Sequence, residues 1–339
     1  MGWLSLRSEG WRYDTRITVL DNTLCWVVWL TRTLTDPKGA LLNATLPGNA
    51  EKLHAMRSVG MLGGDSEGAV GLWRKLLAKY EVEHKTVTVT EHCSLELHTP
   101  AGASGSLPVI LWFHGGGHCV GTGKDAGMEV ALEAFKGVAI VASVSYRMGP
   151  EAPYPAAAED TIAALKYVSE HAKELGATAD ISVAGLSAGG NLAAVAAHNA
   201  AELGIDVKCA MLFVPEMTTN DVSWSWVENA SVQALPAEVM IAWLQGYLPD
   251  RKLALEPNAS PLFVEKSVLA KLAGKCSFVV HTASCDILRD CGVEYVDKLR
   301  AAGVTVAHVM ARSSHSFSLL VDAKAKAQSV EAWKAAFLK

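Results

Sequence analysis

The sequence is organised around residues 180–203, where a short apolar strand pattern runs directly into an alanine-rich helix pattern. Residues 185–189, between the two patterns, have the form Gly-x-Ser-x-Gly. A turn this tight brings backbone segments close together, so the positions around the serine need residues without a Cβ, and three glycines meet that need. The pattern predicts a turn that lifts the hydroxyl of Ser187 clear of a sheet, beside the N–H of Ala188 at a helix N-terminus.

From residue 86 onward, strand patterns and helix patterns alternate along the chain. Continuous apolar runs are typical of strands buried on both faces, as in a parallel sheet covered by helices. We therefore expect an α/β fold with a mostly parallel central sheet flanked by helices, whose first two strands form an antiparallel edge. The expected strands are Thr86–Thr90, Ser94–His98, Val109–Phe113, Ala139–Ser145, Ile181–Leu186, Cys209–Val214, Ser277–His281 and Val304–Met310. The expected helices are Glu129–Phe135, Ala156–Leu175, Leu192–Leu203 and Gly292–Ala302.

Two segments do not follow this alternation. Residues 1–80 carry apolar and tryptophan residues at helical spacing, including a helix pattern over 68–80. A second tryptophan-rich segment interrupts the pattern in the middle of the chain, and we expect it to lie over the carboxyl ends of the strands, where α/β sheets bind ligands. The expected organisation is a helical segment over 1–80 and a main domain over 81–339, with an insertion at about 216–262.

The charge and hydropathy of the chain argue against two classes of partner. The formal net charge is −5 and no run rich in Lys or Arg is present, so nucleic acid is not expected as a partner. The apolar run at residues 24–30 is too short to cross a membrane, and residues 1–12 lack a signal-peptide pattern, so no stable membrane insertion is expected. Cysteines without C-x-x-C spacing predict free thiols in a reducing compartment, hence a cytoplasmic protein.

A second glycine-rich motif, His114-Gly115-Gly116-Gly117, follows the strand pattern that ends at residue 113. Consecutive glycines let backbone N–H groups face a ligand without side chains in the way. Such donors stabilise the oxyanion that forms when a serine attacks an acyl group, by about 3–4 kcal/mol per donor. A loop of this composition is the usual partner of a Gly-x-Ser-x-Gly turn. We expect His114 to hold the loop by hydrogen bonds rather than to act as a base.

Two further residues lie where late strand patterns end: Asp286 after the strand 277–281, and His315 after the strand 304–310. The order Ser187, Asp286, His315 is that of nucleophile, acid and base in one known arrangement. In that arrangement the histidine takes the serine proton and later protonates the leaving group, while the aspartate fixes the imidazole tautomer. Asp290 competes for the acid role, but its position four residues later favours a supporting one.

Other chemistries fit the sequence less well. Cys119 and Cys285 each lie beside a polar residue that could activate a thiol, but neither is on an elbow turn. The eleven histidines form no metal-ligand spacing such as H-E-x-x-H, and the glycine pattern at 121–124 lacks a complete phosphate-binding frame. No metal and no cofactor is therefore expected.

Taken together, these residues resemble the hormone-sensitive-lipase branch of the α/β-hydrolases. The resemblance covers roughly residues 85–320 and implies an α/β-hydrolase fold with a helical cap, built from the N-terminal segment and the insertion. It also implies oxyanion donors at the backbone N–H groups of Gly116, Gly117 and Ala188, and a supporting role for Glu151. The motifs that carry it are His114–Gly117, Tyr146–Pro155, Gly185–Ala193, Asn258–Leu262, Asp286–Asp290 and His315–Phe317.

Three positions depart from the family pattern. Leu186 stands where the family most often has an acidic residue, Ile287 replaces a proline, and Ser316 replaces a glycine. None of these changes removes a catalytic atom. The resemblance implies a serine carboxylesterase that acts on small to medium acyl esters, with a small-molecule ester as its partner and a homodimer as one state open to it. The alternatives are an amidase, deacetylase or acyltransferase with the same triad, and a non-catalytic small-ligand receptor on the same fold.

Overall fold

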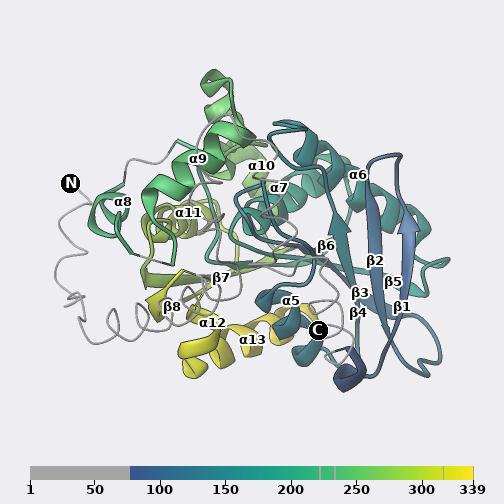
Figure 1. The fold of residues 1–339 in the computed structure, drawn as a ribbon. Coiled ribbons are helices and arrows are strands. Elements are labelled where there is room, and N and C mark those ends of the chain that lie inside the picture. Colours follow the sequence, from purple (N-terminus) through teal and green to yellow (C-terminus); the bar gives the residue numbers. More distant parts are fainter. Residues whose placement is uncertain (1–76, 221–222, 233, 316, 339) are drawn as a thin grey trace, which may run out of the picture.

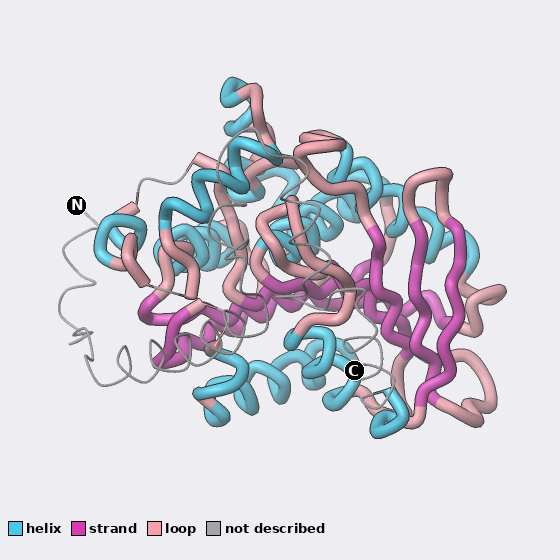
Figure 2. Tube along the Cα trace, in the orientation of Figure 1, coloured by secondary structure: helices cyan, strands magenta, loops and turns pink. Residues whose placement is uncertain are grey.

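The computed structural model describes residues 77–220, 223–232, 234–315 and 317–338. The segment 1–80, expected to be helical, lies outside the described residues except at its end, where residues 77–80 are helical. The described chain forms one eight-stranded sheet in the order β1-β2-β4-β3-β5-β6-β7-β8, drawn in magenta in Figure 2. The strands are β1 (Val82–Thr88), β2 (Ser94–Pro100), β3 (Leu107–Phe113), β4 (Ile140–Ser145), β5 (Ala177–Leu186), β6 (Val207–Phe213), β7 (Ser277–Cys285) and β8 (Val306–Ser314).

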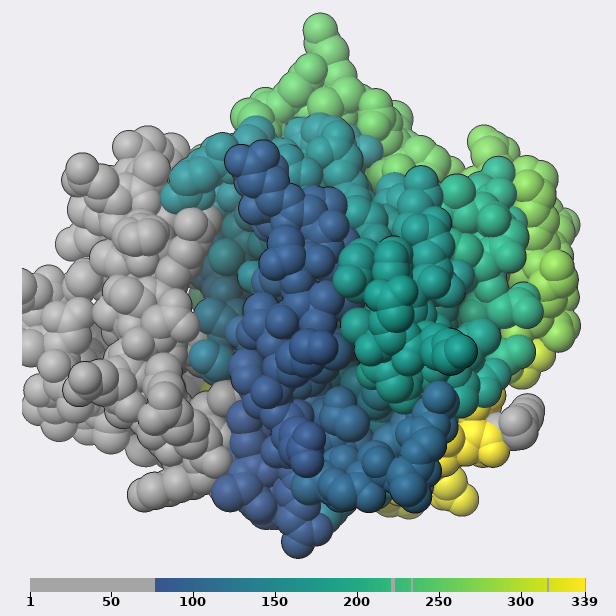
Figure 3. Space-filling model, turned by 90° about the vertical axis from the view of Figure 1, so that its right-hand side faces the viewer, coloured from purple at the N-terminus to yellow at the C-terminus, as the bar shows by residue number. Residues whose placement is uncertain are grey.

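The sheet is parallel except at one edge. β1 pairs with β2 and β2 with β4 in antiparallel fashion, whereas the pairs from β4 and β3 through to β8 are all parallel. The predicted antiparallel edge is therefore confirmed. β1 is mostly exposed and polar, with the sequence VEHKTVT, and its charged side chains discourage pairing with another chain. Figure 3 looks onto this blue edge of the molecule.

Helices cover both faces of the sheet (Figure 1). α6, α7, α10 and α11 pack with one apolar cluster on one face, and α5, α12 and α13 pack with a second cluster on the other. The helices are α5 (Ala126–Ala134), α6 (Ala156–His171), α7 (Ala188–Leu203), α8 (Trp224–Glu228), α9 (Ala237–Tyr247), α10 (Lys266–Leu272), α11 (Arg289–Ala301), α12 (Ser318–Val321) and α13 (Ala323–Phe337), with short 3₁₀ turns η2 (Arg251–Leu255) and η3 (Pro261–Phe263).

Several predicted bounds are wrong, and hydrogen bonds explain the differences. The first strand was expected at Thr86–Thr90, but it ends at Thr88 because the N–H groups of Val89 and Thr90 both donate to Cys93 O in a tight turn. β7 and β8 extend to Cys285 and Ser314, past their expected ends at His281 and Met310. Polar residues at strand ends carry no hydrophobic pattern, although the backbone pairing continues through them.

The chain between β6 and β7 contains α8, α9, η2, η3 and α10. Trp243 of α9 lies against the loop that follows β3, and Ser225 of α8 is bonded to the loop that follows β7. Both loops leave the carboxyl ends of parallel strands, so α8 and α9 lie over that edge of the sheet. Part of this segment, in light green, projects at the top of Figure 3. Within the described ranges, no helix is long and apolar enough to cross a membrane.

Candidate active site

Ser187 lies at the turn from β5 into α7, as the sequence predicts. Its backbone has φ 58° and ψ −117°, a conformation that residues with a side chain rarely adopt, and its N–H donates to Phe213 O over 2.8 Å. A Cβ on Gly189 would lie 2.0 Å from Phe113 O, and one on Gly185 would lie 2.1 Å from Gly189 O. The turn can form only with glycine at these positions, which explains the Gly-x-Ser-x-Gly pattern.

The three residues predicted from chain order lie in hydrogen-bond contact. His315 Nε2 is 2.9 Å from Ser187 Oγ, and His315 Nδ1 is 2.7 Å from Asp286 Oδ2. A carboxylate can only accept, so Nδ1 carries the proton and Nε2 is left to accept from the serine hydroxyl. The side chains of the aspartate and histidine are almost wholly buried, while the serine residue is 7 % exposed. The arrangement can therefore transfer a proton from the serine hydroxyl to the imidazole.

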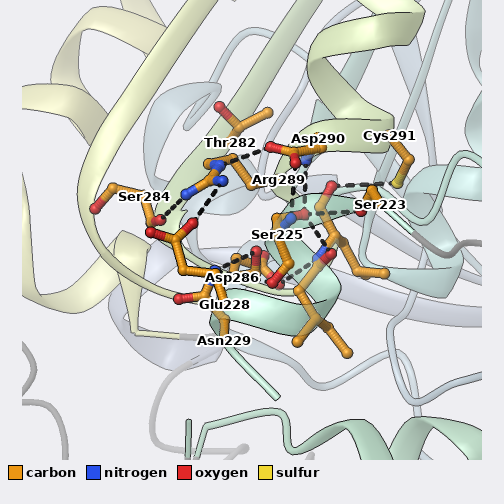
Figure 4. A network of polar contacts seen from close by, with 12 residues as sticks. Ser223, Ser225, Glu228, Asn229, Thr282, Ser284, Asp286, Arg289, Asp290 and Cys291 are labelled. Carbon is orange, nitrogen blue, oxygen red and sulfur yellow. Dashed lines mark hydrogen bonds and ion pairs between the residues drawn. The ribbon is translucent and has the colours of Figure 1, made fainter. Parts of the chain in front are cut away.

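The loop after β7 supports Asp286 through its own backbone and through α8 (Figure 4). The second carboxylate oxygen of Asp286 accepts from Leu288 N–H at 3.0 Å, which holds the side chain against its loop. Asp290 faces elsewhere: its Oδ2 accepts from Ser225 N–H at 2.7 Å and its Oδ1 accepts from Arg289 Nε at 2.8 Å. The contacts of Asp290 therefore anchor the start of α8, and they do not reach His315.

The glycine loop after β3 passes directly beside the nucleophile turn. The Cβ position of Gly115 lies 3.5 Å from Ser187 Cβ. Gly116 has φ 120° and Gly117 has φ 58°, and a Cβ on Gly117 would lie 2.3 Å from the ring of Trp243 in α9. The loop thus adopts a backbone that side chains disfavour, in contact with both the elbow and a helix of the insertion.

Several side chains hold this loop in place. His114 Nδ1 donates to Gly115 O at 2.7 Å, and the ring stacks on Tyr146, whose hydroxyl donates to His114 O at 2.8 Å. Asp125 accepts from Gly115 N–H at 3.1 Å and from Met128 N–H at 2.8 Å, and burial raises the pKa of Asp125 to about 6. The contacts of His114 agree with the expected loop-holding role.

Some site residues were missed by sequence reasoning, and others lie away from the triad. Asp125 was not foreseen, although its place three residues before Met128 at a helix start is a typical N-cap signal. Glu151 is exposed in the turn between β4 and α6, and its supporting role stays a prediction. Leu186 and Ile287, two of the departures from the family pattern, are buried, and Ser316 lies outside the described residues.

One group among the described residues has metal-ligand geometry. His84, Glu96 and His98, on β1 and β2, place one ligand atom each within 4.8 Å of one another. The triplet lies at the β1 edge of the sheet, whereas Asp286 and His315 follow β7 and β8 at the other edge. It therefore takes no part in the serine site.

The comparison with known proteins agrees with this geometry. The family described as alpha/beta hydrolase fold matches residues 110–319. The chain is 36% identical to carboxylesterase NlhH of Mycobacterium tuberculosis over 262 residues. This match covers 75% of this chain and 81% of NlhH. The gibberellin receptor GID1A of Arabidopsis thaliana is 29% identical, with 62% of each chain covered.

A solved structure gives the same result at the level of the fold. The crystal structure of a thermostable esterase from Pseudomonas putida ECU1011 superposes with a TM-score of 0.68 at 30% identity, and the match covers 87% of this chain and 97% of that one. The fold, the motifs and these relatives agree. The chain belongs to the α/β-hydrolases, within their hormone-sensitive-lipase-like branch of carboxylic ester hydrolases.

Proposed function

We propose that this carboxylic ester hydrolase is a serine carboxylesterase that cleaves small to medium acyl esters through an acyl-enzyme on Ser187. The observation that carries the proposal is the continuous hydrogen-bond chain from Asp286 through His315 to Ser187, at distances of 2.7 and 2.9 Å. At the end of this series of hydrogen bonds, Ser187 lies on a strained turn beside the glycine loop.

The residues support a two-stage reaction. Ser187 Oγ attacks the ester carbonyl carbon while His315 Nε2 takes the hydroxyl proton, and Asp286 stabilises the imidazolium. The histidine then protonates the leaving alkoxide, which departs as the alcohol as the C–O bond breaks. In the second stage, water loses a proton to the same nitrogen and attacks the acyl-enzyme, and the carboxylic acid leaves as Ser187 recovers its proton.

The oxyanion of each tetrahedral intermediate needs preorganised donors. We assign these to the backbone N–H groups of Ala188, at the start of α7, and of Gly116 and Gly117. The position of α7 supports the first assignment, because a helix N-terminus attracts negative charge. The close approach of Gly115 to Ser187 supports the other two, because it brings the glycine loop to the nucleophile.

We assign the cap of the enzyme to the segment 216–262 together with residues 1–80. For the described part, the contacts of α8 and α9 with the two loops that carry site residues support this assignment. Trp243 of α9 lies against Gly117, which supports a role for this side chain in lining the acyl or alcohol side of the site. The substrate range would then depend on aromatic side chains of the cap.

The similarity to a gibberellin receptor suggests an alternative to the esterase, a non-catalytic receptor. A receptor on this fold binds its ligand beneath a cap and needs no functioning triad. The hydrogen-bonded Ser187, His315 and Asp286 favour the enzyme, because a receptor has no need of this proton-transfer geometry.

Labelling with a fluorophosphonate probe tests the proposal. We expect the wild type to be labelled, Ser187→Ala to remain unlabelled, and this variant to lose about 10⁶-fold in kcat. We also expect p-nitrophenyl acetate to hexanoate to be hydrolysed faster than the laurate ester. An unlabelled wild type, or equal labelling of the variant, would favour the receptor instead.

Two coarser expectations accompany the proposal. We place the enzyme in a reducing compartment such as the cytoplasm, a prediction that rests on cysteines scattered through the sequence without C-x-x-C spacing. The homodimer stays a prediction, which light scattering after gel filtration tests.

A further inference from the structure

A buried pair of titratable side chains lies under the active site and has no part in the mechanism above. His118 Nε2 is 3.2 Å from Glu216 Oε2, and both side chains are 0% exposed. Burying a carboxylate away from water is costly unless a partner compensates for the lost hydration. A pair kept at this place therefore calls for a reason beyond stability.

Glu216 is attached directly to the nucleophile turn. Its backbone N–H donates to Ser187 O at 3.2 Å, and its backbone carbonyl accepts from Asn191 Nδ2, in the first turn of α7, at 2.9 Å. These two bonds fix the backbone of Glu216 relative to Ser187. The carboxylate of Glu216 therefore extends from a backbone position that is fixed relative to the nucleophile turn.

His118 belongs to the glycine loop, one residue after Gly117. Its backbone has φ 58°, and its carbonyl accepts from Gly149 N–H at 2.9 Å. The imidazole stacks on the ring of Tyr247 in α9, with centroids 3.8 Å apart and planes 12° apart. The imidazole therefore contacts α9 through its face and Glu216 through its Nε2 atom.

We propose that the Glu216–His118 pair is a tether that positions the glycine loop, and with it the oxyanion donors, against the nucleophile turn and α9. The loop's own turn bonds, from the N–H groups of Cys119 and Val120 to Gly116 O, stay within the loop and cannot set its place relative to Ser187. The inference rests on the proposed function, because it assumes that Gly116 and Gly117 donate to an oxyanion. Both residues of the pair are positioning residues.

The phenols near the pair stay neutral. Burial raises the pKa of Tyr247 and of Tyr146 well above the ordinary value, and the nearby charge of Glu216 raises both further. His118 is therefore the titratable side chain that the structure places directly beside the Glu216 carboxylate. A displacement of the loop by about 1 Å can cost about 10²-fold in rate, which sets the scale of the expected effect.

The test replaces each partner by leucine and measures hydrolysis of p-nitrophenyl acetate. We expect Glu216→Leu and His118→Leu to lower kcat about 10- to 100-fold with KM within threefold, since the tether acts on the oxyanion and not on ground-state binding. The Ki of a trifluoromethyl ketone, which binds serine as an oxyanion, should rise in parallel. The double variant should be no slower than the slower single variant, and Glu216→Gln, which keeps the shape of the side chain but not its charge, should fall between Glu216→Leu and the wild type.

The control is His198→Gln. His198 is a buried histidine on α7, and its Nε2 lies 2.7 Å from Tyr295 Oη on α11. It should lower stability without changing kcat.

The tether is wrong if Glu216→Leu and His118→Leu both keep the wild-type kcat and Ki, or if their losses add in the double variant. If one variant does not fold, the other decides. A wild type that does not hydrolyse the ester contradicts the proposed function, whereas an active wild type with unaffected variants contradicts the tether alone.

Discussion

Asp286, in the loop after β7, and Asp290, in the first turn of α11, face different partners. Asp286 Oδ2 is 2.7 Å from His315 Nδ1, whereas both carboxylate oxygens of Asp290 accept from other donors, at Ser225 N–H and Arg289 Nε. The two residues lie four positions apart, and the sequence alone could only rank them. The hydrogen bonds separate a residue placed to orient the imidazole from one that anchors α8.

The two aspartates should therefore respond differently to the same substitution. We expect Asp286→Asn to lower kcat about 10⁴-fold, because an amide at this position stabilises the wrong imidazole tautomer. We expect Asp290→Asn to lower kcat less than tenfold and mainly to reduce the melting temperature. Kinetics on p-nitrophenyl acetate and thermal unfolding measure both effects. If the two losses in kcat were reversed, the assignment of the acid would have to be exchanged.

At the scale of elements, the site is assembled where a loop, a turn and a helix meet. The glycine loop after β3, the turn from β5 to α7, and α9 approach so closely that Gly117 has no room for a Cβ beside Trp243. Such contacts make the loop geometry depend on a helix more than a hundred residues away in sequence. The glycines are thus required by packing as well as by backbone conformation.

A single methyl group should therefore disrupt the loop. We expect Gly117→Ala to lower kcat at least 100-fold, because the Cβ would lie 2.3 Å from the Trp243 ring and the loop must move away. Gly274→Ala is the matched control, since its φ is +73° and nothing lies within 4 Å of its Cβ position. This control should cost about 1–2 kcal/mol of stability from backbone strain and leave kcat unchanged. Equal rates for both variants would contradict the contact with α9.

The molecule as a whole buries histidines that must remain neutral when it is folded. Burial lowers the pKa of His98 and of His198 to about 3, and that of His281 to about 4. The unfolded chain binds protons at these positions near pH 6.5, while the native chain does not. Protons bound only by the unfolded state lower stability as the pH falls below 6.5. Asp125 acts in the opposite sense, because its raised pKa lets the native state take up a proton between pH 6 and 4.

The folded protein should therefore lose stability in mild acid. Between pH 7 and pH 5, we expect each of the three histidines to remove about 2 kcal/mol from the free energy of unfolding. Urea unfolding at the two pH values measures the total, and His198→Gln should reduce the difference between them by about 2 kcal/mol. Equal stability at both pH values, or the same difference in the variant, would show that these histidines titrate alike in both states.

The sequence by itself determined the fold class, the order of the strands along the chain, and the three residues that meet at the site. These features were legible because each depends on local chemistry: apolar runs for buried strands, glycines for a tight turn, and polar residues just past strand ends. Chain order then sufficed to predict that Ser187, Asp286 and His315 converge, since the carboxyl ends of parallel strands share one edge. The resemblance to a family added the oxyanion donors, whose roles stay a proposal.

Only the tertiary structure decided which remote groups support that site. Three contacts join segments that lie at irregular distances along the chain, so no periodic sequence pattern marks them. They are Asp125 with Gly115, Trp243 with Gly117, and Glu216 with His118. The polar ends of β7 and β8 were missed for a related reason, because backbone pairing continues where the hydrophobic pattern stops. The local sequence pattern indicates which secondary structure a residue favours. Its partners across the molecule depend on how loops from different strands pack together, and the fold alone settles that packing.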